Sequence, residues 1–156
     1  MSAWTRSAAI AVLALVMVTS FATLAAAAPS PAQHFALVPL SGEPLTNGFA
    51  EVIHPNGPQV YAHHVYQLNG AESDRSYDVS ISIWTESLTC SGEPTFVLPA
   101  ASLVTNASGN GRADVVFDPA QVAALGLRGL EIGGNITVSR EGSPAYATGC
   151  KVIELD

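Results

Sequence analysis

Apolar and polar side chains alternate strictly along residues 76–84, and this is the clearest structural signal in the chain. Successive side chains of a strand point to opposite faces, so the alternation predicts a half-buried β-strand. Its apolar side consists of Tyr77, Val79, Ile81 and Ile83. Its polar side consists of Ser76, Asp78, Ser80 and Ser82. This polar row is either a solvent face or the floor of a binding groove, and we favour a solvent face.

Shorter runs of the same kind, separated by Gly, Pro and Asn, continue along the chain. We expect further strands at residues 34–40, 49–54, 59–68, 95–98, 102–105, 112–118, 129–132, 136–140 and 145–155. Asn56-Gly57 predicts a two-residue hairpin turn between two of them. The strands at 102–105 and 112–118 are expected to form another hairpin, and the glycines at 133–134 a turn. Pro39 indicates an edge strand or the end of a strand.

One short helix is expected after the strand at 112–118. Asp118 can cap it, Pro119 suits its first position and Gly126 can end it. Short strands at regular spacing with turn residues between them are typical of antiparallel sandwiches. The predicted fold class is therefore all-β, an antiparallel β-sandwich of the Ig-like or Greek-key kind with about eight strands and one short helix.

The N-terminal segment has the features of a secretory leader. Arg6 precedes an apolar run at residues 8–18, and Ala25 and Ala27 form a small-residue cleavage site. We expect residues 1–27 to be a Sec-type signal peptide and residues 28–156 a single secreted or periplasmic domain with no membrane contact after processing. The alternative is an uncleaved membrane anchor, although the Ala-rich composition is typical of a bacterial leader.

Composition and charge exclude one class of partner. Charged residues are only 12% of the chain, so Ser, Thr, Asn, Gln and Gly must build much of the surface. Thirteen acidic residues stand against six basic ones, and Arg6 lies in the leader, so the expected mature domain has a formal charge of −8. The acidic residues are scattered along the chain. Nucleic acid is therefore not an expected partner.

Cys90 and Cys150 are the only cysteines. In an exported protein they are expected to form a disulfide, because disulfides persist in oxidising compartments. Closing a loop of this length stabilises a fold by about 4 kcal/mol in the chain-entropy model. A catalytic thiol would need a neighbour that stabilises the thiolate, and only Lys151 is adjacent.

Three histidines form the one grouping that resembles a metal site, namely His54, His63 and His64. His63 and His64 are adjacent in a strand and must point to opposite faces. A turn at Asn56-Gly57 places His54 and His63 on one face but about 13 Å apart, which is too far for one ion. We therefore predict no metal and no cofactor, although His34 could complete a site.

The same hairpin register predicts an acid–imidazole pair. It places Glu51 diagonal to His64, on a core face that also holds Phe49 and Ile53. A carboxylate that orients an imidazole is half of a catalytic arrangement, but no serine or cysteine nucleophile with a recognisable signature accompanies it. We interpret the pair as structural and predict no catalytic residue.

Part of the chain resembles a known family. The order LSGEPLTNGFAEV, followed by a hairpin that leads to VYQLNGAESDRSYDVSI, is similar to the opening of small secreted bacterial domains of the CHRD type. The resemblance implies an Ig-like or superoxide-dismutase-like sandwich of unsettled function. Where that family has an Ala-His-Ile-His-like segment, this chain has AHHV at residues 62–65.

The leading functional hypothesis is a secreted, disulfide-stabilised β-sandwich without enzymatic activity. It would bind an unknown extracytoplasmic ligand or protein, or have a structural role. The alternative is a zinc- or copper-binding sandwich that uses His63 or His64. A third and weaker hypothesis is a hydrolase, which would need a nucleophile within reach of His64.

Overall fold

The structure is a computed structural model that describes residues 32–53, 62–117, 119–127 and 129–154. Its elements are β1 (Ala32–Ala36), β2 (Val38–Pro39), β3 (Asn47–Ile53), β4 (His63–Asn69), β5 (Ser76–Trp84), β6 (Phe96–Val104), β7 (Gly111–Val116), α1 (Pro119–Ala124), β8 (Glu131–Arg140), β9 (Ser143–Ala147) and β10 (Lys151–Glu154). Every strand pairing is antiparallel.

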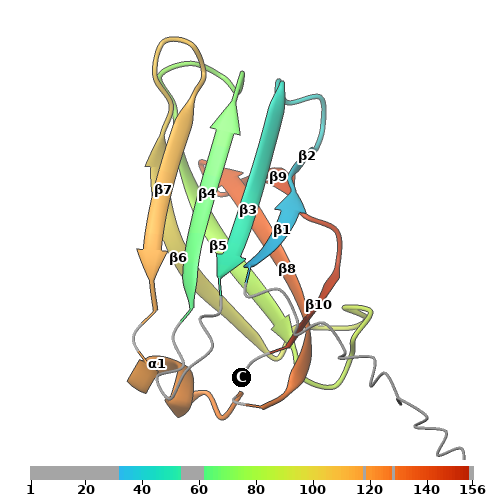
Figure 1. Cartoon of the computed structure of the whole chain (residues 1–156). Helices are drawn as coiled ribbons and strands as arrows, with labels where there is room; N and C mark the ends of the chain where they lie inside the picture. Colours follow the sequence, from blue (N-terminus) through green and yellow to red (C-terminus); the bar gives the residue numbers. More distant parts are fainter. Residues whose placement is uncertain (1–31, 54–61, 118, 128, 155–156) are drawn as a thin grey trace, which may run out of the picture.

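The strands form two sheets that pack face to face (Figure 1). The four-stranded sheet has the order β1-β3-β4-β7. The six-stranded sheet has the order β2-β9-β8-β5-β6, with β10 also paired to β8. Helix α1 lies below the four-stranded sheet in Figure 1. The prediction of an all-β antiparallel sandwich is confirmed.

Strand β5 has the alternation that its sequence predicts. Its four apolar side chains are all at most 6% exposed and face the other sheet. Both edges of β5 are hydrogen-bonded, one to β6 and the other to β8. The apolar side of β5 therefore lies in the middle of the core, together with Tyr66, Leu68, Val138 and Tyr146.

Two predicted strands are each divided into two. The segment at 34–40 becomes β1, which pairs with β3, and β2, which pairs with β9 in the opposite sheet. The chain changes sheets at Leu37, which is buried and donates its N–H to Gly48 O at 2.9 Å. Pro39 lies in the last strand of its sheet, as predicted, where a missing N–H breaks no ladder. The segment at 145–155 is divided into β9 and β10 by residues 148–150.

In two other places the sequence predicts two short strands where the structure has one continuous strand. The strands predicted at 95–98 and 102–105 are both part of β6, and those predicted at 129–132 and 136–140 are both part of β8. Pro99 does not break β6, because the ladder between β5 and β6 shifts register there and leaves Ala100 as an extra, bulged residue. Residues 133–134 do not form a turn but lie inside β8. The predicted hairpin of 102–105 with 112–118 is also wrong, since β6 and β7 belong to different sheets.

The predicted register of the β3–β4 hairpin is wrong by three residues. His63 pairs with Ile53 and His64 with Val52, whereas a turn at Asn56-Gly57 would pair His63 with Ala50. The tip of this hairpin lies outside the described residues. An odd shift moves every β3 side chain to the other face. Ala50 and Val52 are therefore buried, while Glu51 lies on the outer face, where its carboxylate does not need a partner in the core.

Local turn and helix signals agree with the structure. Helix α1 begins at Pro119, and Gly126 follows it with a φ of +65° and donates its N–H to Ala123 O. The β8–β9 hairpin turns at Glu141 and Gly142, both with positive φ, between the paired residues Arg140 and Ser143. Two consecutive positive φ values are typical of the tight turn that matches the twist of paired strands.

The predicted disulfide is present. Cys90 and Cys150 are bonded with a Cα–Cα distance of 5.8 Å. The bridge joins the loop after β5 to the link between β9 and β10. The same loop also packs closely on β8, because a Cβ added at Gly133 would lie 2.1 Å from Ser87 O. This glycine is needed because the loop backbone approaches the strand directly.

A second tie closes the upper end of the sandwich in Figure 1, where β8 ends. Arg140 forms ion pairs with Glu43 and Glu72, the first at 2.8 Å. Glu43 lies in the loop from β2 to β3 and Glu72 in the loop from β4 to β5, so one guanidinium at the end of β8 joins two loops that connect the sheets. Tyr146 adds a hydrogen bond to Pro44 O at 2.9 Å.

Removing the disulfide should destabilise the fold. For the Cys90→Ala/Cys150→Ala double variant we expect the free energy of unfolding to fall by about 4 kcal/mol, because the unfolded chain regains the entropy of an open loop of 60 residues. Urea unfolding followed by circular dichroism measures the loss. Wild-type protein unfolded in a reducing agent is the matched control and should behave like the variant. A loss below about 1 kcal/mol would contradict the expectation.

The contact of the loop with β8 can be tested separately. Gly133→Ala should lower the free energy of unfolding by about 1–3 kcal/mol, because the new methyl group displaces the Ser87 backbone. Gly149→Ala is the control, because nothing lies within 4 Å of a Cβ at this position beside the same disulfide. It should change the stability by less than about 0.5 kcal/mol. Equal effects of the two substitutions would exclude the close contact.

Candidate functional site

The structure places the predicted histidines apart. His63 lies on the outer face of the four-stranded sheet, and His64 is 6% exposed on its inner face. The prediction that these neighbours point to opposite faces is therefore confirmed. His54 lies outside the described residues. His34 is on the outer face of β1, where its ring lies 4.4 Å from the ring of Phe49.

His64 belongs to a small polar group inside the core. Its Nδ1 is 2.8 Å from the hydroxyl of Tyr66, two residues along the same strand. Its ring packs edge-to-face with that of Phe117, with 5.0 Å between the ring centroids. Tyr66 is 1% exposed, and burial raises the pKa of its hydroxyl. A phenol with a raised pKa is a poor nucleophile, so this group does not provide the arrangement that a hydrolase needs.

The predicted pairing of Glu51 with His64 is wrong. Glu51 is opposite Val65 and lies on the outer face, while His64 lies on the inner face. The register explains the error. The shift of three residues moves each β3 side chain to the opposite face, so side chains predicted to be neighbours across the hairpin lie on different faces.

A charged cluster lies on the outer face of the four-stranded sheet. Arg112 donates two hydrogen bonds to Asp114, both at 2.9 Å, and His63 Nε2 is 3.5 Å from the same carboxylate. The hydrogen bonds from Arg112 hold the pKa of Asp114 below its usual value. Asp114 is thus already paired with a cation. The cluster has the character of a surface ion pair, which contributes little to stability.

No group of three His, Cys, Asp or Glu side chains among the described residues could hold a metal ion. His63 and His64 cannot act together, because the sheet separates them. The alternative of a zinc- or copper-binding sandwich that uses His63 or His64 stays a hypothesis.

The polar row of β5 is on the outer face of the six-stranded sheet. Three members of the row are directly opposite a polar residue of β8. Asp78 pairs with Ser139, Ser80 with Thr137, and Ser82 with Asn135. We call these six residues the polar face. Asn135 and Thr137 are joined by a hydrogen bond of 3.1 Å. The face thus presents hydroxyl and amide groups on neighbouring strands about 5 Å apart.

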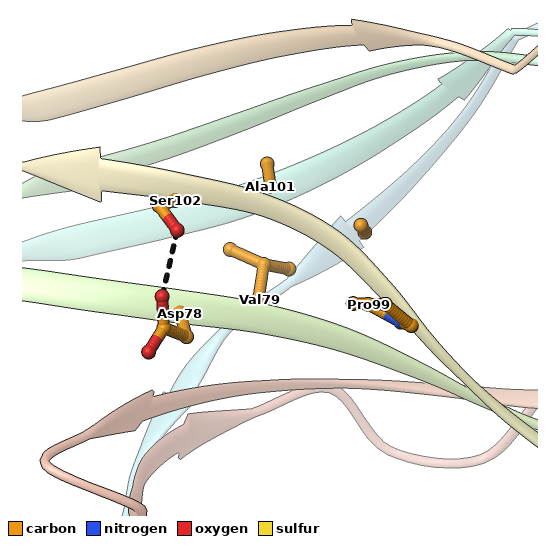
Figure 2. Close-up of a pocket in the computed structure, with 6 residues that line it drawn as sticks. Asp78, Val79, Pro99, Ala101 and Ser102 are labelled. Carbon is orange, nitrogen blue, oxygen red and sulfur yellow. Dashed lines mark hydrogen bonds between the residues drawn. The ribbon is translucent and has the colours of Figure 1, made fainter.

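A hollow of about 500 Å³ opens where this face meets β6. It is lined by Asp78, Val79, Pro99, Ala100, Ala101 and Ser102. Figure 2 shows Asp78 on β5 and Ser102 on β6 pointing toward one another, and Ser102 Oγ donates to Asp78 Oδ1 at 2.6 Å. The hollow lies at the bulge of Ala100, so the irregular ladder forms it. It is a shallow depression that is open to solvent over much of its surface.

Sequence reasoning identified the polar row but not this hollow. Pro99 is the signal in the sequence, because a strand tolerates proline at an edge or a bulge, but the predicted strands at 95–98 and 102–105 leave it between them. Two short strands cannot form a bulge between them. Ser102 was therefore not connected with Asp78.

The described residues include no helix long and apolar enough to cross a membrane.

Burial of Tyr66 predicts a loss of stability in alkali. Its pKa is raised in the folded chain above the usual 10.0, which the unfolded chain keeps. The contribution of this hydroxyl to the free energy of unfolding is therefore fully present below pH 10.0. Above that pH the free energy of unfolding falls by up to about 1.4 kcal/mol per pH unit, because the unfolded chain loses the proton first.

Urea unfolding of wild type and Tyr66→Phe on either side of that pH tests this expectation. Wild type should be the more stable by about 1 kcal/mol at neutral pH, because it keeps the hydrogen bond to His64. The difference should shrink as the pH rises. Curves that stay parallel would mean that the hydroxyl ionises normally in the folded chain.

Comparisons with known proteins do not assign the chain to a family. No family model matches the sequence, and no curated protein or solved structure matches it either. The resemblance to CHRD-type domains stays a prediction. A function must be inferred from the geometry of the chain's own residues.

Proposed function

We propose that the chain is exported and acts outside the cytoplasm as a non-enzymatic binding module, with the hollow beside the polar face as its binding site. The disulfide supports the location, because a bond of this kind persists in oxidising compartments and is rare in the cytosol. The leader at residues 1–27 supports the same location.

The observation that supports a binding role is that polar groups of the hollow still have hydrogen-bonding capacity for a ligand. Several groups that could react or bind already have partners within the described part of the fold. Both cysteines are bonded to each other, His64 contacts Tyr66, and Arg140 is between two carboxylates. Asp78 differs, because it is exposed and has a single protein hydrogen bond, from Ser102, in the described part of the chain.

A binding role suits this site better than catalysis. Catalysis of acyl transfer needs a nucleophile, a base and an oxyanion hole that converge on one point. The lining of the hollow has one carboxylate and one hydroxyl, and the hydroxyl donates its proton to that carboxylate. Such a pair can hold a ligand by hydrogen bonds.

Expression of the full chain in a bacterial host tests the proposal. We expect the protein outside the cytoplasm, with the mass of residues 28–156 less two hydrogens for the disulfide. Ala27→Phe is the control, because a bulky residue at this position should block cleavage and leave the full-length chain in the membrane fraction. Wild-type chain that stays full-length in the cytoplasm would refute the location. Turnover of an ester, peptide or glycoside by pure protein, abolished by one substitution, would refute the non-enzymatic role.

A further inference from the structure

We infer that the hollow at the β6 bulge binds a neutral carbohydrate, with Asp78 and Ser102 holding its hydroxyl groups. The inference rests on the proposed binding function and names its ligand class. It follows from the hydrogen-bonding capacity of the lining, from its apolar part and from the neighbouring polar face.

The bulge determines where a ligand can lie. In the β5–β6 ladder Val79 pairs with Ala101 and Ser80 with Pro99, so Ala100 has no partner on β5. A bulged strand bends and twists more strongly than a regular one. Figure 2 shows β6 curving across β5 in this region. The strand is also the last of its sheet, so solvent and ligand reach the hollow from the open side.

The polar part of the lining mainly accepts hydrogen bonds. An ionised carboxylate has about four lone-pair sites, and Ser102 uses one of them. Ser102 gives its proton to Asp78, so its own lone pairs are left to accept. A ligand must therefore bring donors. A sugar brings several hydroxyl donors on adjacent carbons, which a carboxylate oxygen pair can receive together.

The apolar part of the lining selects for a ligand that is not polar on all sides. Pro99, which is exposed and pairs with Ser80 of the polar face, presents its hydrocarbon ring on the outer side, whereas Ala100 and Ala101 pack against the core. A pyranose ring has C–H groups on one face and hydroxyls around its rim, so it matches a site with both characters. A free inorganic cation would not use the apolar groups. Anions are disfavoured because Asp78, the charged residue of the lining, is negative.

The polar face continues the site along β5. Ser80, Ser82 and Trp84 follow Asp78 on the same side of the strand, and the half-buried indole of Trp84 is held by a hydrogen bond to Gly92 O at 2.9 Å. From Asp78 to Trp84 the strand rises by about 20 Å. This length suits several linked sugar units. We therefore expect tighter binding of a polysaccharide than of its monosaccharide.

Native electrophoresis in gels that contain neutral polysaccharides tests the inference. The full chain is negatively charged, so it migrates to the anode and is retarded by a polysaccharide that it binds. The panel consists of glucans, mannans, galactans and xylans, and mobility against polysaccharide concentration yields Kd. At least one of them should retard wild type, and the free monosaccharide should compete only weakly.

Two substitutions test the site, and a third is the control. Asp78→Asn and Ser102→Trp should each weaken binding about tenfold or more, the first by loss of a charged acceptor and the second by filling the hollow. Asp114→Asn removes the same charge on the opposite sheet and should leave Kd within about twofold. Thermal unfolding of each variant separates lost binding from lost folding, and Ser102→Trp keeps the charge if Asp78→Asn does not fold.

Three outcomes would overturn the inference. The first is no retardation by any polysaccharide of the panel, and the second is equal retardation of wild type and both hollow variants. The third is capture of wild type on immobilised spermine that is lost in Asp78→Asn but not in Asp114→Asn. It would show that the ligand is a polyamine and not a carbohydrate, while the hollow would keep a binding function. Failure of the proposed function is separate, because export and the absence of turnover are measured without any sugar.

Discussion

Strand β5 is the element on which the rest of the sandwich depends. Its apolar side is buried against the opposite sheet, and both of its edges are hydrogen-bonded, so it has neither a free edge nor a choice of face. Burying one large apolar side chain stabilises a fold by about 1.5–3 kcal/mol. Four such residues on one strand decide which side of the sheet faces inward.

The same period of two creates the polar face. Every inward side chain of β5 from Tyr77 to Ile83 is apolar, every outward one between them is polar, and β8 pairs the outward row with Ser139, Thr137 and Asn135. The face is regular where β5 pairs with β8. It becomes irregular where β5 pairs with β6, and the hollow lies at that irregularity. The proposed binding site therefore lies at an irregularity of the β5–β6 ladder, on a strand whose ladder with β8 is regular.

Both ends of the sandwich are closed by links between segments distant in sequence. At the end of β5, Cys90 and Cys150 join two loops, and the close contact of Gly133 with Ser87 O holds one of these loops on β8. At the other end, Arg140 joins the loops that contain Glu43 and Glu72. With the ends tied, the six-stranded sheet is held in one conformation, which would reduce the entropy lost if the proposed ligand binds on its outer face.

Local sequence determined those features whose causes are local. The alternation of β5, the helix that begins at Pro119 and the turn after Arg140 each follow from neighbouring residues, and two cysteines allow only one intramolecular bridge. Tertiary structure alone decided the sheet change at Leu37, the β3–β4 register, the continuity of β8 through Gly133 and the bulge at Ala100. Each of these depends on which distant strand supplies the hydrogen bonds and the packing partner, and residues along one segment do not specify that partner. Half of the candidate site, the row with Asp78, could thus be predicted from sequence, whereas Ser102 joined it only through the fold.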